Sequence, residues 1–175
     1  MTLQIRINKI QKQFGDIKAL NDIEDVFESG KLHGLIGPEG AGKTTLLRNL
    51  MGLVLPSSGN IEFYENSKIV SFEHIKNKIS YMPQRQSLYP DLSIEEHLHF
   101  FKSLYGLDEK YFELKSRELL EITRLNKFLD RPAGKLSGGM YKKLGLMLSL
   151  LQSPKVLLLD EPTNGVDPIS RREFW

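Results

Sequence analysis

A glycine-rich stretch, GPEGAGKTT, occupies residues 37–45 and fits the pattern G-x-x-x-x-G-K-[ST]. Glycines let such a loop turn its backbone N–H groups toward a phosphate, and a helix that starts there adds partial positive charge. In this pattern Lys43 would reach the β- and γ-phosphates of a nucleotide, and the Thr44 hydroxyl would bind Mg²⁺. The alternative is a glycine-rich turn with a solvated lysine, which a strand–loop–helix context disfavours. The expected nucleotide contacts are Gly37, Pro38, Glu39, Gly40, Ala41, Gly42, Lys43, Thr44 and Thr45.

The stretch LLLDEP supplies two carboxylates directly after an apolar run. A buried strand that ends in Asp160 places this carboxylate at the edge of an α/β sheet where ligands bind. Asp160 would hold Mg²⁺ in its outer sphere, and Glu161 could orient and polarise an attacking water. In isolation the pair could simply cap a strand before a turn. The phosphate loop upstream favours the chemical interpretation.

A Ser-Gly-Gly triplet opens the helix-like stretch LSGGMYKKLGLM at residues 136–147. Two adjacent glycines at a helix start cost backbone order. The N–H groups of such a bare helix end can bind an anion. The simpler alternative is that Ser137 is the N-cap, with a flexible hinge before it. We expect Met140 to lie on the apolar stripe of this helix, and Lys142 and Lys143 to lie on a solvated face.

The elements that must position these residues follow from hydrophobic periodicity. Alternation of Leu3, Ile5 and Ile7 predicts a half-buried strand. The apolar run at 31–37 is expected to lead as a strand into the phosphate loop, and a helix follows over 44–53. Further strands are predicted at 19–27, 61–65, 78–84 and 155–160, the last buried on both faces of a parallel sheet.

From Leu88 to Ser153 the pattern is helical only. A capping box, Ser93 with Glu96, begins the first helix, a second is expected over 108–125 with Phe112, Leu119 and Ile122 on its apolar side, and a third begins at Ser137. The four histidines show no metal-binding pattern. Helices placed between the strands of a sheet predict an α/β protein with two lobes, a sheet core and a helical insert.

Composition limits the function classes. The 175 residues correspond to about one domain, and 24 basic against 22 acidic residues leave a net charge of +2, which does not indicate nucleic-acid binding. The absence of cysteine excludes disulfides and thiolate metal sites. Neither a signal core nor an apolar run of membrane-spanning length is present, so a membrane role would require a partner.

Taken together, the motifs resemble those of ABC-type ATPases. LSGGM, residues 136–140, stands between a phosphate loop and LLLDEP in the family's order, with Met in place of the usual Gln. The resemblance implies a P-loop NTPase core with a mixed or parallel sheet, an N-terminal antiparallel β subdomain and an inserted helical subdomain. It predicts an ATP-binding core at 1–87 and 154–175 and a helical signature subdomain at 88–153.

The resemblance also implies roles for individual residues. Gln84 in YMPQ matches the Q-loop glutamine, which acts in catalysis and, with Thr44 and Asp160, at Mg²⁺. Phe14 matches the aromatic residue that stacks on adenine, although it could instead be a core residue, and Gln84 could be a surface loop residue. Asp167 in NGVDP matches the acidic position of the D-loop. The signature residues would cap the nucleotide of a second ATPase domain, in trans: Leu136, Ser137, Gly138, Gly139 and Met140.

Within the family the motifs look most like those of ATP-binding components of bacterial multidrug-type exporters. This implies ATP and Mg²⁺ as cofactors, an integral-membrane permease as partner, and a second ATPase domain, either identical or a tandem half. It also implies a peripheral position on the cytoplasmic face of the bacterial inner membrane and no nucleic-acid partner. Residues 85–92 would contact the permease, with Tyr89 and Leu92 as apolar contacts; the alternative is that these two side chains pack between the lobes.

Two alternatives and one departure accompany this interpretation. The alternatives are a soluble, non-transport ABC-type ATPase acting in translation or on DNA, and a different phosphate-loop enzyme such as a kinase or GTPase. The family places a switch histidine on a later strand, whereas this chain stops at Trp175. We therefore expect the isolated chain to be truncated, to bind nucleotide and to hydrolyse it poorly compared with a longer chain that carries that strand.

Overall fold

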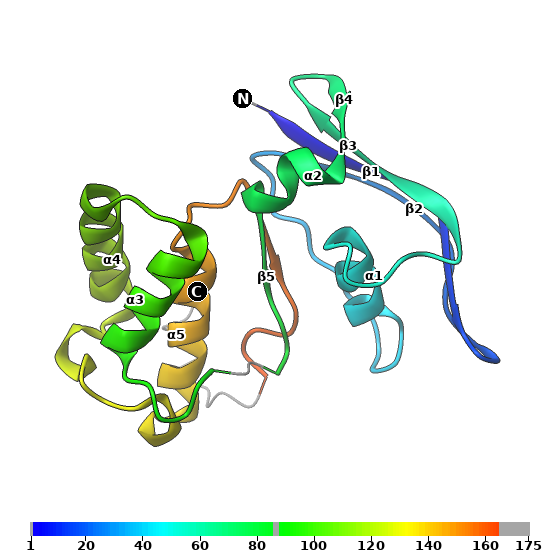
Figure 1. Ribbon diagram of the computed structural model, residues 1–175. Helices are drawn as coiled ribbons and strands as arrows, with labels where there is room; N and C mark the ends of the chain where they lie inside the picture. The colour runs from blue at the N-terminus through cyan, green and yellow to red at the C-terminus, as the bar shows by residue number, and fades with distance from the viewer. Residues whose placement is uncertain (1, 86–87, 165–175) are drawn as a thin grey trace. The chain divides into compact units, whose positions relative to one another are not determined.

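The structure is a computed structural model that describes residues 2–85 and 88–164 (Figure 1). The chain divides into two compact units, Met1–Ile79 and Ser80–Trp175, and each contains buried apolar residues. Asp167, the predicted D-loop residue, lies outside the described residues. Within the described ranges, no helix combines the length and the apolar character that a membrane span requires.

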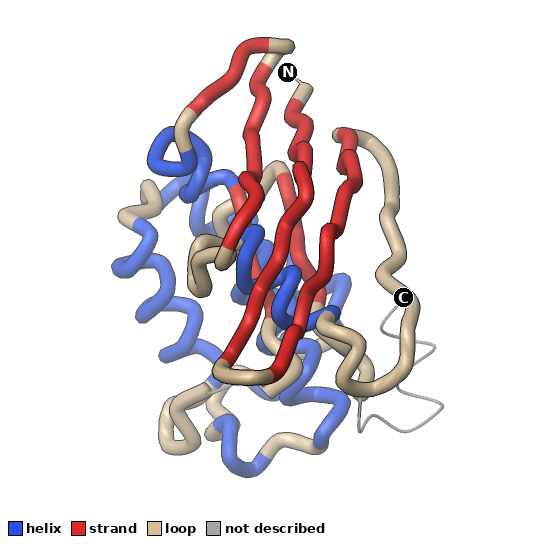
Figure 2. The backbone as a smooth tube through the Cα atoms, turned by 90° about the vertical axis from the view of Figure 1, so that its right-hand side faces the viewer, coloured by secondary structure: helices blue, strands red, loops and turns tan. Residues whose placement is uncertain are grey.

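A four-stranded antiparallel sheet with the order β2-β1-β3-β4 forms most of the first unit (Figure 2). Leu3, Ile5 and Ile7 are at most 5% exposed, because successive side chains of a strand point to opposite faces. The strand predicted from their alternation is confirmed, as are the strands expected near 19–27 and 61–65. The four strands are β1 (Leu3–Phe14), β2 (Ile17–Glu28), β3 (Ser58–Glu65) and β4 (Lys68–Val70).

The helix after the phosphate loop is α1, Lys43–Leu50, and it buries three leucines on one face. It is shorter than the predicted 44–53, because a turn follows in which Gly52 has a φ of +65°. Leu53, beyond this turn, is 61% exposed. The prediction placed the helix end too late because Leu53 fits the helical spacing of the apolar residues. It lies beyond the turn, however, and is not part of the helix.

The apolar run at 31–37 is not a strand, contrary to the prediction. It belongs to neither sheet of the described residues, and Leu32 and Ile36 are 95% and 98% exposed. A strand exists only where a neighbour takes up its backbone N–H and C=O groups, and no described strand pairs with this run. The phosphate loop is therefore entered from a segment without regular secondary structure rather than from a strand.

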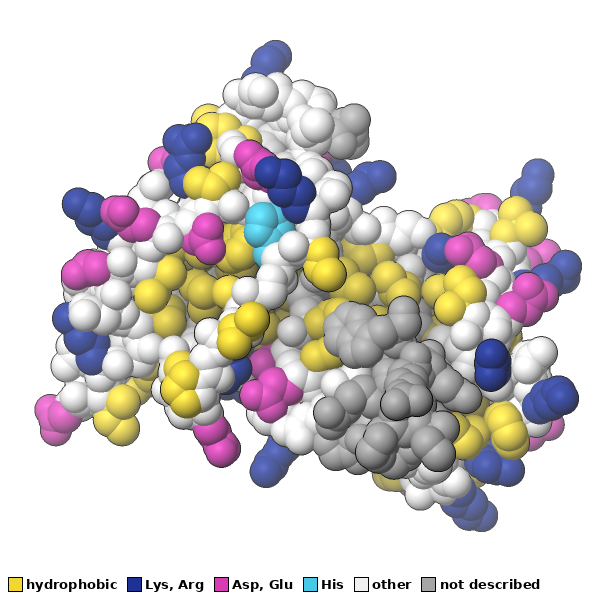
Figure 3. Space-filling model, turned by 180° about the vertical axis from the view of Figure 1, so that it is seen from behind, with side chains coloured by type: hydrophobic (Ala, Val, Ile, Leu, Met, Phe, Trp, Pro, Cys, Tyr) yellow, Lys and Arg dark blue, Asp and Glu magenta, His cyan; other side chains and the backbone are white. Residues whose placement is uncertain are grey.

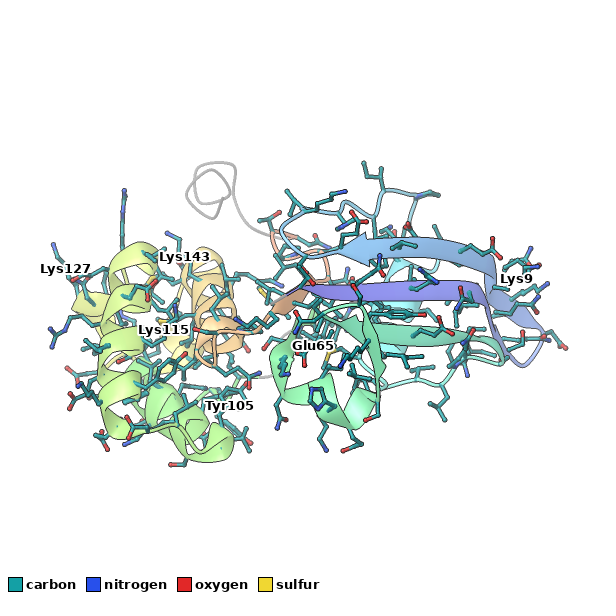
Figure 4. The ribbon with its side chains drawn as sticks, turned by 90° about the horizontal axis from the view of Figure 1, so that it is seen from above. Lys9, Glu65, Tyr105, Lys115, Lys127 and Lys143 are labelled. Atoms are coloured by element: carbon teal, nitrogen blue, oxygen red, sulfur yellow. The ribbon has the colours of Figure 1, made fainter. Side chains whose placement is uncertain are left out.

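A cluster of charged side chains connects the end of β3 to two short helices, α2 (Phe72–Ile75) and η1 (Lys76–Lys78). Lys78 Nζ lies 2.6 Å from Glu65 Oε1, and His74 Nε2 lies 2.9 Å from Glu65 Oε2. Glu65, labelled in Figure 4, has a side chain that is only 12% exposed. The hydrogen bonds from Lys78 and then from His74 hold the pKa of Glu65 below its ordinary value, although burial opposes them.

We expect this cluster to make the stability of the fold depend on pH. Because the pKa of Glu65 is lowered by folding, its contribution is present above the unfolded carboxyl pKa of about 4.3 and is lost as the pH falls through the lower folded value. The difference in urea midpoint between wild type and Glu65→Gln should be largest near neutral pH and should shrink below about pH 4. Glu24→Gln, an exposed site on β2, is the control; a Glu65→Gln difference that stays constant with pH would contradict the assignment.

The second unit combines a two-stranded sheet with a group of helices. The strands β5 (Ile79–Met82) and β6 (Val156–Leu159) pair with each other. The helices are α3 (Ile94–Tyr105), α4 (Glu109–Thr123) and α5 (Gly138–Leu150), with short 3₁₀ turns at η2 (Asn126–Phe128) and η3 (Ala133–Lys135). Their shared core consists of Ile94, Leu98, Phe112, Leu119, Leu125, Ala133, Leu144, Met147, Leu148 and Leu151.

The predicted helix starts in this unit are confirmed by their caps. Ser93 and Glu96 form the reciprocal capping box, with hydrogen bonds of 3.1 and 2.7 Å. Two details differ from the sequence-based expectation. Ile122, assigned to the buried side of α4, is 68% exposed, and the residues of β6 are only half-buried rather than buried on both faces.

A fully buried histidine, His97, fixes the segment before α3. Its Nδ1 lies 2.8 Å from the carbonyl oxygen of Ser93, and its Nε2 accepts the backbone N–H of Tyr89 at 3.1 Å. Because the Ser93 oxygen can only accept and the Tyr89 N–H can only donate, Nδ1 acts as the donor and Nε2 as the acceptor. His97 therefore ties Tyr89 to the N-cap of α3 and has a structural function.

Candidate functional site

The phosphate loop requires glycine at its last position. Gly42 is the N-cap of α1 and has a φ of +88°, in the left-handed region that side chains rarely adopt. A Cβ at this position would lie 2.3 Å from the backbone oxygen of Ala19, so a larger residue would collide with β2. Gly40 also has a positive φ, +77°. Between these two glycines, the N–H of Ala41 donates to the Pro38 carbonyl at 3.3 Å, and this bond closes a turn within the loop.

Lys43, the first residue of α1, folds back over this loop. Its Nζ donates to the carbonyl oxygens of Gly37 at 2.9 Å and Pro38 at 2.8 Å. The ammonium group is therefore held at the mouth of the loop by backbone atoms. Thr44 and Thr45 follow in the first turn of α1, where backbone N–H groups lack helical partners. Such an arrangement can take up an anion at the helix N-terminus.

In the second unit, Asp160 lies directly after β6 and is 2% exposed. Its N–H donates to the Met82 carbonyl at 3.0 Å, which extends the pairing of β5 and β6 by one residue. The hydroxyl of Tyr81 donates to Asp160 Oδ2 at 2.9 Å. Tyr81 thus orients the carboxylate, a contact that the sequence analysis did not identify.

Glu161 and Gln84 are in direct contact. Gln84 Nε2 donates to Glu161 Oε2 at 2.7 Å, and Asn164 Nδ2 donates to the same oxygen at 2.9 Å. Glu161 has a φ of +46°, an unusual value for a residue with a side chain. A strained backbone held by surrounding contacts is common at functional sites. Gln84 lies in the loop after β5 and is half-buried.

Lys142 is not on a solvated face, contrary to the prediction. This half-buried side chain donates from Nζ to the backbone carbonyl of Gln84 at 2.5 Å. Burial lowers the pKa of Lys142, and the negative charge of Asp160 opposes this effect. Helical spacing could not reveal the contact, because the partner of Lys142 lies 58 residues earlier in the chain.

The signature residues form a capped helix start. Ser137 is the N-cap of α5, and its hydroxyl accepts the N–H of Met140 at 3.3 Å. Ser137 and Gly138 are exposed, whereas Gly139 is buried. Leu136 and Met140 pack against the helical core, as expected for Met140. The exposed part of the helix start is therefore limited to Ser137 and Gly138, while its neighbours pack against the core. The N-cap interpretation is compatible with anion binding there.

Phe14 lies at the end of β1, next to the hairpin turn, and is 48% exposed. The alternative that its ring belongs to the core is therefore wrong. Lys12 Nζ lies 4.9 Å from the ring centroid, in a cation–π arrangement. An exposed aromatic face of this kind can stack on a planar base, as the resemblance implies.

The oxygen donors fit Mg²⁺ by their chemistry. Mg²⁺ prefers hard oxygen ligands such as hydroxyl, carboxylate and amide oxygens, which are the groups of Thr44, Asp160 and Gln84. In the part of the chain that the structure describes, no group of three or more His, Cys, Asp and Glu residues could hold a metal.

Comparison with known proteins places the chain in a family. A family model described as "ABC transporter" matches residues 20–164. The chain is 44% identical, over 98% of its length, to the probable multidrug ABC transporter ATP-binding protein YbhF of Escherichia coli K12, and covers 30% of that protein. It is 36% identical, over 98% of its length, to the Nod factor export ATP-binding protein I of Burkholderia lata, and covers 56% of it. The chain thus spans between about a third and a little over half of these two relatives.

Solved structures show the same fold. The structure titled "Structure of ATP binding subunit of ABC transporter" superposes with a TM-score of 0.82 at 29% identity, covering 97% of this chain and 70% of that one. A nucleotide-free ATP-binding cassette from an ABC transporter superposes with a TM-score of 0.78 at 27% identity, covering 99% and 74%. The predicted P-loop NTPase fold with its antiparallel β part is thereby confirmed. The chain belongs to the ABC transporter family.

Proposed function

We propose that this chain is the ATP-binding and ATP-hydrolysing part of a subunit that powers export through a separate membrane permease. The observation that carries the proposal is the phosphate loop, in which only glycine fits at position 42 and Lys43 is held over the loop mouth. The names of the relatives, which are multidrug and Nod factor export ATP-binding proteins, support export rather than a soluble non-transport function.

Each nucleotide is bound by residues from two ATPase domains. The phosphate loop of one domain holds the phosphates, and the exposed start of α5 in the other domain, at Ser137 and Gly138, caps them. The second domain is either a second copy or a tandem half. Phe14 contributes its exposed ring to the adenine. We retain 1–87 with 154–175 as the ATP-binding core, 88–153 as the signature subdomain, and Asp167 as the D-loop residue.

Mg²⁺ would be held by Thr44, Gln84 and Asp160. When bound, it would neutralise part of the negative charge of the phosphates. Tyr81 keeps Asp160 oriented through the 2.9 Å hydrogen bond. Glu161 accepts a proton from the attacking water, and two amide donors fix its carboxylate for this role. Opening and closing of the paired domains then transmits ATP turnover to the permease.

The partner and the location follow from the same proposal. Residues 85–92, which include the exposed Tyr89, contact the cytoplasmic part of the permease, so the subunit lies peripherally on the cytoplasmic face of the inner membrane. Basic and acidic side chains are interspersed on the face seen in Figure 3. The described residues drawn on that face form no continuous basic surface of the kind that binds nucleic acid.

We expect Ser137→Arg to block pairing of the ATPase domains while leaving ATP binding by a single domain within about twofold, because the bulky side chain occupies the exposed helix start. Pairing is measured by light scattering after ATP addition to the full-length protein, and binding with a fluorescent ATP analogue. Ser137→Ala is the matched control, since it loses the same N-cap bond without adding bulk. Loss of ATP binding by the single Ser137→Arg domain would show that the signature does not act in trans.

A further inference from the structure

One side chain connects the signature helix to the groups proposed to act in hydrolysis. Lys142 belongs to α5 and donates from Nζ to the carbonyl oxygen of Gln84 at 2.5 Å. Gln84 in turn donates from Nε2 to Glu161 Oε2 at 2.7 Å. The three residues come from three separate segments of the chain, and two hydrogen bonds join them in sequence. All three lie in the second unit.

The chemistry of these contacts makes the bond from Lys142 strong enough to fix the position of Gln84. The bond from Lys142 is charge-assisted and half-buried, so it is stronger than a neutral hydrogen bond at the surface. Ordering a lysine side chain costs conformational entropy, which a solvated lysine would avoid. The bond fixes the backbone of Gln84, and the position of that backbone determines whether its amide reaches Glu161. Asn164, three residues after Glu161, donates to the same Glu161 oxygen.

We propose that Lys142 is a positioning residue that sets the place of Glu161 through Gln84, so that movement of α5 reaches the hydrolytic groups of its own chain. Lys142 lies about 7.5 Å along the helix axis from Ser137. Because α5 is one rigid helix, a shift at its first turn is carried to Lys142. The inference rests on the proposed function: the helix that caps the neighbour's nucleotide also holds the Gln84–Glu161 pair of its own site.

Turnover of the full-length protein tests the inference. We expect Lys142→Met to lower kcat for ATP by about tenfold with the KM for ATP changed less than about twofold, as is typical when a partner behind a site residue is removed. Lys142→Arg should recover most of kcat, because it restores a charged donor. The matched control is Lys110→Met, at an exposed position on α4. Lys142→Met turnover equal to that of Lys110→Met would overturn the inference.

A double-mutant cycle shows whether the effect passes through Gln84. In the Gln84→Ala background, Lys142→Met is expected to lower kcat by less than about twofold, because the intermediate is already removed. If Lys142→Met lowers kcat by the same factor in the Gln84→Ala background as in the wild type, the inference is overturned.

Hydrogen–deuterium exchange supplies a readout that does not depend on turnover. Lys142→Met should accelerate amide exchange in peptides that contain Gln84, whereas Lys110→Met should not. Unchanged exchange at Gln84 would overturn the inference even if turnover fell. Accelerated exchange in a protein whose wild type does not hydrolyse ATP would support the positioning by Lys142 and refute the proposed function, so the two failures are distinguishable.

Discussion

Glu161→Gln is expected to slow ATP turnover by about 100- to 10,000-fold, the range typical of removing a general base, while ATP binding changes little. The substitution keeps the size of the side chain and an oxygen that can accept the amide protons of Gln84 and Asn164, which lie 2.7 and 2.9 Å from Oε2. It removes the negative charge that would take a proton from water. The local geometry should therefore survive while the chemistry is lost, and the ATP-bound paired state should accumulate.

The measurement is single-turnover hydrolysis together with equilibrium ATP binding, both in the full-length protein. Glu121→Gln is the matched control, because Glu121 is an exposed glutamate on α4 in the same unit. Turnover of Glu161→Gln within about threefold of the control would refute the role of Glu161 as base. A large loss of ATP binding would instead indicate that the carboxylate mainly holds the strained backbone at its φ of +46°.

Local signals in the sequence predicted much of this molecule. The capping box of Ser93 and Glu96, the alternation of Leu3, Ile5 and Ile7, and the N-cap at Ser137 all depend on residues within a few positions of each other. Such patterns report local geometry directly, because cap bonds and strand faces are determined within one turn or one pleat.

The misjudged elements depend on distant partners. The run at 31–37 has the composition of a strand, but strand formation requires a neighbour, and none of the described strands pairs with it. Ile122 satisfies the helical spacing of α4 and is nevertheless exposed, because the width of a buried stripe is determined by what packs against it. Tertiary packing therefore decided what periodicity left undetermined.

The same distinction applies to the site. The phosphate loop was recognisable because its chemistry lies within nine consecutive residues. Tyr81, Asn164 and Lys142 were assigned no role at the site, although the stretches YMPQ, NGVDP and LSGGMYKKLGLM that contain them were singled out for other residues. The contacts of Tyr81 with Asp160 and of Lys142 with Gln84 cross 79 and 58 residues of chain. Only the fold brings Tyr81 and Lys142 to these partners, so residue type and spacing carry no signal for the two contacts, whereas Asn164 lies three residues from Glu161.

Lys43→Ala is expected to weaken ATP binding by roughly 10- to 150-fold, which corresponds to the loss of one charge-assisted hydrogen-bonding group at the phosphates. In the structure, Lys43 Nζ already lies at the mouth of the phosphate loop, 2.9 and 2.8 Å from the carbonyl oxygens of Gly37 and Pro38. Its charge offsets those carbonyl dipoles, which would otherwise repel an anion. Alanine removes the attraction and leaves the two oxygens facing the phosphate.

The measurement is equilibrium binding of a fluorescent ATP analogue with and without Mg²⁺, with Lys68→Ala, at an exposed position on β4 of the same unit, as the control. Lys43→Arg separates charge from shape, because a planar guanidinium carries the charge but does not fit a site built around a compact ammonium. We therefore expect Lys43→Arg to bind ATP nearly as weakly as Lys43→Ala. Wild-type affinity in Lys43→Ala would mean that the backbone N–H groups of the loop and α1 suffice for phosphate binding, and that Lys43 serves only to hold the loop closed.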